Sequence, residues 1–294
     1  MKKCILFLLA PCLLVSVSIQ IAAQSAVPPP KILLIVREEI KTGMMPAHSA
    51  EANNVVRIYA KARSPHYRLA MVPVAGNENE VMYFWGFDSF AALEKSNKDL
   101  DTIATVTYKA DFDKIRPPGD DYHTSQRDSI AVFRDDLSYR AATDIARMRY
   151  MRVQTVRVKP GHVRDFENGR RMIKAAHEKA RVDENMAVYQ LVAGAQGNTY
   201  LVLIPWNSLD GLGTLPHGKD YRDAMGDNNW DKLDKIDDES IVFNAVDVYA
   251  FNPQLSYMSP QAVSVDPGFW TLRPMTTATS PAPRKAGKTA ANRQ

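Results

Sequence analysis

The chain has almost no cysteine and lacks the short motifs that mark several common enzyme classes. Its two cysteines, Cys4 and Cys12, both fall close to the N-terminus. There is no Gly-x-Ser-x-Gly elbow, phosphate-binding glycine loop, dinucleotide fingerprint or His-Glu-x-x-His string. These absences exclude a disulfide-rich scaffold. They also remove the sequence support for a serine hydrolase, a nucleotide-dependent enzyme or a zinc protease.

Positive charge is scarce outside the two ends of the chain. The whole sequence has 37 Lys and Arg against 33 Asp and Glu, whereas residues 24–272 have 30 basic and 33 acidic side chains. The basic character therefore belongs to the termini and not to a binding face. Because nucleic-acid binding depends on clustered positive charge, we expect no nucleic-acid partner.

The N-terminus has the order of a secretion signal. Two lysines precede an apolar run over residues 4–17, and small residues follow. The run is short for a membrane span. We expect a signal peptide over residues 1–23, with cleavage after Ala23 or, alternatively, after Ala26; an uncleaved anchor is the other reading. The cleaved chain would be periplasmic or extracellular, without stable membrane insertion and without cysteine.

The C-terminal segment offers little to bury. It is rich in threonine, alanine, proline and lysine, and it has basic but no acidic side chains. Segments of this composition cannot bury enough apolar surface to offset the entropy of ordering. We therefore expect residues 274–294 to form a disordered basic tail.

An internal repeat occurs at a fixed offset of 118 residues. Residues 41–76 aligned with residues 159–194 give eight identities in 36 ungapped columns. The same offset returns later, where Leu-Ser-Tyr occurs twice, after a one-residue slip near two tryptophans. The period suits a duplicated domain and is too long for a solenoid. The repeat predicts two homologous units, residues 31–140 and residues 149–258.

Each unit shows the same succession of patterns. An apolar or β-branched segment leads to a Lys-x-Gly turn, an amphipathic helix, a hairpin with a Gly-Asn turn, a polar helical segment and a last strand. This β-α-β-β-α-β order is ferredoxin-like, so we expect an α+β fold. The expected strands are residues 32–40, 67–74, 81–87 and 130–133, then 151–158, 186–192, 199–204 and 246–251; the expected long helices are residues 44–63 and 162–181.

Four features of the second unit carry a family resemblance. A Lys-Pro-Gly turn ends its first strand, Phe166 follows on the helix, Tyr189 lies on the second strand, and Trp206 closes the third. With these features, residues 156–212 resemble the antibiotic-biosynthesis-monooxygenase-like group of dimeric α/β-barrel domains. The first unit shares the turn and a tryptophan but is more diverged.

The resemblance implies an architecture and a range of activities. The sheets of the two units would pack as one α/β barrel, which a tandem chain can build by itself, and a homodimer is left open. A cavity would lie in each unit between the sheet and its helices. Members of the group oxidise aromatic compounds without a cofactor, degrade haem or have no known reaction.

The candidate ligand-binding residues are histidines and aromatic residues on the predicted elements. His177 lies on the apolar stripe of the second unit's helix, and Tyr59 holds the same position in the first. A functional His177 would orient a ligand, move a proton or hold a metal or haem. The alternative is a core histidine bonded to a backbone carbonyl. The tentative set is His177, Tyr189, Trp206, His217, His48 and Tyr59.

No metal site is expected, because none of the six histidines pairs with another at helical spacing. The pattern assigns no catalytic residue and no cofactor, and it leaves open whether the protein is an enzyme. It favours an exported, duplicated α/β-barrel protein whose cavity between sheet and helices holds a small apolar ligand, or nothing. The alternative is a cofactor-independent monooxygenase-like or haem-handling enzyme that uses the second unit.

Overall fold

The computed structural model of the chain describes residues 26–115, 122–214 and 218–273. The expected signal peptide, the expected basic tail and His217 lie outside the described residues. Within the described ranges, no helix combines the length and the apolar character needed to cross a membrane.

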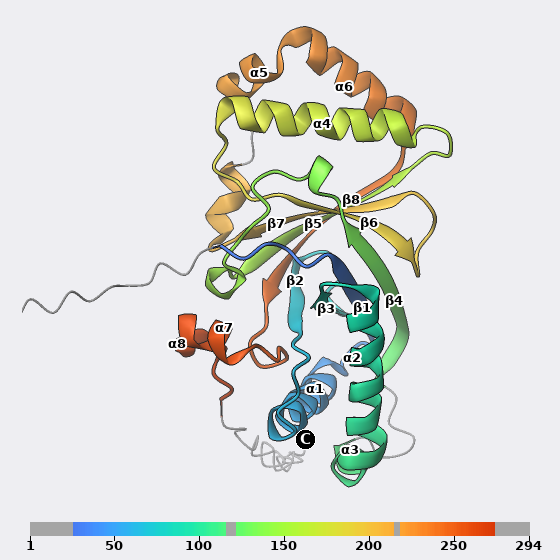
Figure 1. Cartoon of the computed structure of the whole chain (residues 1–294), viewed down its shortest axis with the longest axis vertical. Coiled ribbons are helices and arrows are strands. Elements are labelled where there is room, and N and C mark those ends of the chain that lie inside the picture. Colours follow the sequence, from blue (N-terminus) through green and yellow to red (C-terminus); the bar gives the residue numbers. More distant parts are fainter. Residues whose placement is uncertain (1–25, 116–121, 215–217, 274–294) are drawn as a thin grey trace, which may run out of the picture.

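Eight antiparallel strands close into one barrel in the order β1-β3-β2-β8-β5-β7-β6-β4 (Figure 1). The expectation of an α+β barrel is thus confirmed. Closure pairs every strand on both sides, so the sheet has no open edge. The strands are β1 (Ile32–Ile40), β2 (Leu69–Ala75), β3 (Glu80–Phe87), β4 (His123–Phe133), β5 (Tyr150–Val158), β6 (Ala187–Ala193), β7 (Thr199–Trp206) and β8 (Ile241–Phe251).

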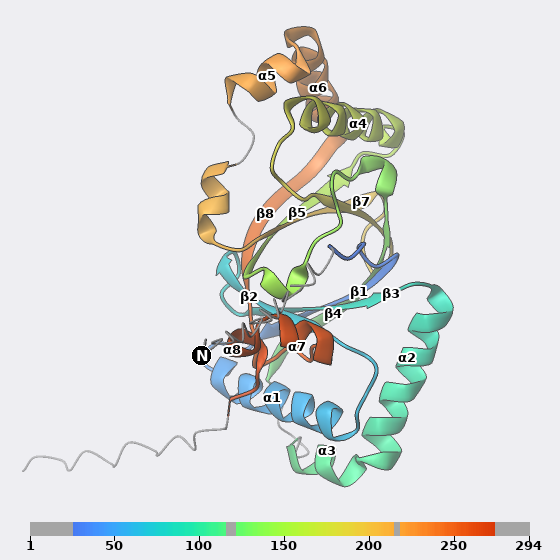
Figure 2. The same cartoon turned by 60° about the vertical axis from the view of Figure 1, so that its left-hand side comes forward.

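Two groups of helices cover opposite sides of the barrel (Figures 1 and 2). The first group belongs to the first half of the chain and contains α1 (Met45–Lys61), α2 (Phe90–Thr102) and α3 (Lys109–Ile115). The second group contains α4 (Val163–Ala180), α5 (Lys219–Met225) and α6 (Asp227–Ser240). Two short helices near the C-terminal end of the described chain, α7 (Pro260–Val265) and α8 (Pro267–Trp270), lie beside the barrel near α1.

Where both of its faces are buried, a strand is apolar on both faces. On β1, Leu33 and Ile35 belong to a core inside the barrel, whereas Val36 and Ile40 belong to a core beneath the first-half helices. A third core, which includes Phe166, lies beneath α4. Successive side chains of a barrel strand alternate between interior and exterior. The barrel wall therefore separates an interior core from two outer cores, one beneath each group of helices.

The expected long helices and the first three strands of each half lie within about two residues of their observed bounds. The last strands were predicted too short, because β4 begins at His123 and β8 at Ile241. Their first residues are mostly polar or solvent-exposed, and they pair with β1 and β5 through the backbone. Backbone pairing does not require apolar side chains, so hydrophobic patterning does not reveal these strand starts.

One irregularity occurs at corresponding places in the two halves. The pairing of β1 with β4 shifts after Glu39, so that Ile40 faces His123. The pairing of β5 with β8 shifts after Arg157, so that Val158 faces Ile241. Each shift leaves one extra residue in the longer strand, which is the geometry of a β-bulge. The two bulges are 118 residues apart, the offset of the sequence repeat.

Candidate functional site

A cavity of about 500 Å³ lies at one end of the barrel interior. Its walls come from the inner faces of strands of both halves, including Leu33, Leu69, Phe84, Met151 and Leu203. We expected a cavity between the sheet and the helices, and the position of this cavity corrects that expectation. The reason is close packing outside the wall: Phe166 of α4, for example, packs on the Tyr200 ring with 4.9 Å between ring centroids.

Three segments outside the barrel wall border the mouth of the cavity: the prolines at 28–30, the linker at residues 141–146, and α7 with the residues before it. The Tyr189 hydroxyl donates a 2.9 Å hydrogen bond to the Pro30 carbonyl. Gly86 provides the room for this contact, since a Cβ there would lie 2.4 Å from Pro30 Cγ. The proline segment is therefore seated on the barrel and bonded to it.

The lining of the cavity is mostly apolar, with Arg68 and Asp144 as its charged residues. The guanidinium carbon of Arg68 lies 4.6 Å from the Tyr83 ring centroid and 5.6 Å from that of Trp85. Burial raises the pKa of Tyr189, so its hydroxyl stays neutral. Among the described lining residues there is no histidine or cysteine. The cavity therefore does not fit a haem that needs an axial ligand of either type.

Of the predicted site residues, Tyr189 lines this cavity and the other described ones do not. Trp206 is buried in the core beneath α4. Tyr59 packs against Tyr257, with 6.0 Å between ring centroids. His177 and His48 each take part in a separate polar contact beneath a helix. The described members of the predicted set are therefore spread over several places in the fold, and His217 lies outside the described residues.

His177 lies on the buried face of α4 and has acceptors at both ring nitrogens. Its Nδ1 donates to the Ile173 carbonyl at 2.8 Å, and its Nε2 lies 3.3 Å from Glu184 Oε2. The Tyr221 ring meets it edge-on at 5.1 Å between centroids. These are the contacts of a histidine that ties α4 to its surroundings.

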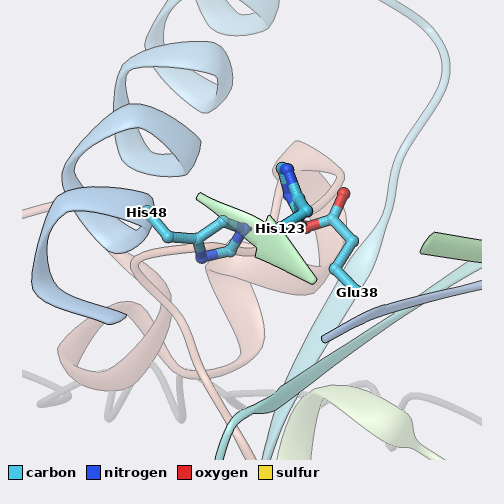
Figure 3. Close-up of side chains that lie close together, drawn as sticks. All are labelled: Glu38, His48 and His123. Atoms are coloured by element: carbon cyan, nitrogen blue, oxygen red, sulfur yellow. Dashed lines mark hydrogen bonds and ion pairs between the residues drawn. The ribbon is translucent and has the colours of Figure 1, made fainter. Parts of the chain in front are cut away.

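His48 belongs to a cluster that the sequence analysis did not find. Its Nε2 lies 2.7 Å from Glu38 Oε2, and His123 Nε2 lies 3.6 Å from the same oxygen (Figure 3). The two imidazole rings meet edge-on, with 5.4 Å between centroids. The three residues come from β1, α1 and β4, so helical histidine spacing could not reveal them. A polar residue at Glu38, within an otherwise apolar strand face, was the available signal.

Electrostatics keep Glu38 ionised. Burial alone would raise the pKa of this carboxyl group, but the hydrogen bond from His48 and the nearby His123 and Arg68 lower it below its usual value. The side chain of His48 is only 4% exposed, that of Glu38 is 15% and that of His123 is 25%. Solvent therefore reaches the cluster mainly from the His123 side.

No family model and no curated protein sequence matches the chain. Among solved structures, it is similar to a proposed monooxygenase from Lactobacillus acidophilus, with 11% identity over 76% of this chain and 94% of the other, and a TM-score of 0.48. An anthrone oxidase-like protein gives 11% identity, coverage of 78% and 93%, and a TM-score of 0.47. A chlorite dismutase variant from Candidatus Nitrospira defluvii gives 6% identity over 76% of this chain and 92% of the other, and a TM-score of 0.46. Similarity this distant does not indicate a ligand or a reaction.

Proposed function

We propose that the protein binds a small apolar ligand in the cavity at the end of its barrel. The observation that carries this proposal is a cavity of about 500 Å³ whose lining is mostly apolar and comes from both halves. Pockets for small molecules typically have volumes of about 300–1,000 Å³ and bury most of the ligand. The driving force would be removal of the ligand's apolar surface from water.

The mouth of the cavity supports the same function. Proline fixes its own backbone angle, so the segment 28–30 loses little entropy when it covers a ligand. The Tyr189 hydrogen bond to Pro30 holds this segment on the barrel. Because the Tyr189 hydroxyl is engaged there, the ligand we propose needs no polar group opposite it.

A fluorescent apolar probe tests the proposal. N-phenyl-1-naphthylamine should bind the purified chain and gain fluorescence. Ala187→Trp places an indole on the inner face of β6 at the cavity wall and should weaken binding at least about tenfold, because the volume is filled. Ala110→Trp adds the same indole to an exposed position of α3 and should leave binding unchanged.

The outcomes separate the competing readings. No fluorescence gain with the wild-type chain, or equal binding by the Ala187→Trp variant, would contradict the proposal. Binding accompanied by oxygen-dependent conversion of an aromatic compound would instead favour the monooxygenase-like alternative. A haem titration that yields a one-to-one coloured complex, lost in Ala187→Trp, would favour haem handling.

The duplicated ferredoxin-like organisation is part of the same proposal. Residues 31–140 and 149–258 each contain strand, helix, two strands, helices and strand in that order. The corresponding bulges before Ile40 and Val158 support a duplication, because a bulge is a specific backbone feature. A cavity built by both units explains why one chain would keep two copies.

Export is likewise proposed from the leader pattern alone. N-terminal sequencing of protein from the cell envelope should find Gln24 or Val27 as the first residue. A mature chain that keeps Met1 in the cytoplasm would refute export and would leave the cavity proposal untouched.

A further inference from the structure

We propose that Glu38, His48 and His123 form a binding site for a divalent first-row transition metal ion of the zinc type. Two imidazole nitrogens and one carboxylate are a ligand set that such ions prefer. The three ligand atoms all lie within 4.8 Å of one another (Figure 3). The cluster lies outside the barrel wall, on the face of β1 opposite the apolar cavity, so this proposal does not depend on the cavity.

The distances suit an ion with small side-chain adjustments. Ligands about 2.0–2.2 Å from a zinc ion lie about 3–3.5 Å from one another. The Glu38 oxygen lies 2.7 Å from His48 Nε2 and 3.6 Å from His123 Nε2. An ion would replace the direct contact between His48 and Glu38, and rotamer changes would suffice to open that gap. The ionised state of Glu38 supplies the negative charge that an ion requires.

The backbone brings His123 to this position through the bulge in β4. Ile40 pairs with His123, whereas Glu39 pairs with Ser125, so Thr124 is the extra residue. Directly paired residues point to the same face of a sheet, and Ile40 and Glu38 share a face because they are two positions apart. In a regular ladder Thr124 would pair with Ile40, and His123 would point to the opposite face, into the barrel. Bulges commonly re-aim side chains next to functional sites.

The second half shows that the fold does not need these polar groups. At the positions 118 residues further on it has Val156, Phe166 and Ile241, and its bulge is intact. These three side chains pack in the apolar core beneath α4. Buried polar groups are costly where apolar ones fit. The cluster is thus an addition of the first half that the fold does not require, and three metal-ligating side chains placed together point to a role in binding.

The partial exposure of His123 gives an ion a route to the site. Its side chain is 25% exposed, whereas that of His48 is 4% exposed. Three protein ligands leave a coordination position free for water or another small group, as in zinc sites that are not purely structural. That position would face the His123 side, where solvent is nearest.

Metal titration of the full chain, produced without a polyhistidine tag and freed of metal with a chelator, tests the site. Zn²⁺ by calorimetry and Co²⁺ by visible absorption should each show one equivalent bound. His48→Phe and His123→Ile, which copy the residues of the second half, should each weaken binding at least about 100-fold, because loss of an outer-shell partner alone costs 10–100-fold. Glu38→Gln keeps the size of the side chain and should weaken binding at least about tenfold.

His162→Ala is the matched control, since His162 is a partly exposed histidine outside the cluster and its loss should not change metal affinity. Circular dichroism and urea denaturation report whether each variant is folded. Absence of stoichiometric metal binding by the wild-type chain would overturn the proposal. So would unchanged affinity in Glu38→Gln, whatever happens to the folding of the histidine variants. Loss of metal binding in folded variants, with His162→Ala unaffected, supports the site.

Discussion

The two halves of the barrel share a backbone plan and differ in what they bury beneath their first helices. The first half places a carboxylate, a buried histidine and a partly exposed histidine there, whereas the corresponding positions of the second half are apolar. Both halves have the same register shift between their first and last strands, β1 with β4 and β5 with β8. The strand register and the bulge thus occur both with and without the polar cluster. They belong to the fold, whereas the polar cluster is an addition of the first half.

The second half, in turn, has a buried polar pair that the first half lacks. Beneath α4 the second half buries His177 against Glu184, and the corresponding residues of the first half are Tyr59 and His66. His66 instead contacts Asp99 of α2 at 2.7 Å. Each half therefore places its buried titratable groups at different positions, and the two are not equivalent in chemistry.

The largest expected effect comes from putting a carboxylate into the second half. Val156→Glu copies Glu38, but Phe166 stands where His48 would be and Met186 stands where Arg68 would be. Val156 is 1% exposed, so the new carboxylate would be buried without the two histidines that accompany Glu38, although the Arg170 guanidinium lies against Met186 in the same layer. We expect the free energy of unfolding to fall by about 3 kcal/mol at pH 7, the low end of the cost of a buried charge that lacks its partners. Urea denaturation measures it.

Val156→Ala is the control for lost packing alone and should cost less than the glutamate. If Val156→Glu were as stable as the wild-type chain, the second half would tolerate polar groups at this layer. The absence of the polar cluster from the second half would then no longer assign the cluster of the first half to binding.

A smaller effect is expected from His177→Ala. The change removes hydrogen bonds to Ile173 and Glu184 and leaves the Glu184 carboxylate buried. We expect a loss of about 2 kcal/mol in the free energy of unfolding. Affinity for N-phenyl-1-naphthylamine should not change, since His177 does not line the barrel cavity. Lost probe binding at unchanged stability would instead show that His177 serves a ligand.

Local patterns predicted most of the fold, and longer-range geometry decided the site. The Lys-x-Gly turns and the amphipathic stripes located α1 and α4, because these features act within a few residues. Glu38 and His123 come together only because β1 pairs with β4 and a β-bulge changes the face of the sheet to which His123 points. The cavity depends on how the two halves face each other. Neither property is a local feature of the sequence.

The smallest expected effect concerns an ion-pair network that joins the two halves. Arg134, the residue directly after β4, binds Glu167 of α4 and also Asp136, whose carboxylate contacts Arg171. The residue corresponding to Glu167 in the first half is Ser49, which carries no charge. The network therefore ties the last strand of one half to the first helix of the other.

The hydrogen bonds from Arg134 lower the pKa of Glu167 and bring that of Asp136 to about 2. A carboxyl group whose pKa is lower in the folded than in the unfolded chain stabilises the fold above its unfolded pKa of about 4. That stabilisation is lost as the pH falls from about 4 towards 2. Because Asp136 is 43% exposed, solvent screening limits the effect to about 1 kcal/mol. Glu167→Gln should therefore narrow the difference in urea midpoint between pH 7 and pH 3, whereas Glu94→Gln, in an exposed pair of α2, should not. An unchanged difference in Glu167→Gln would mean that the network does not couple the halves.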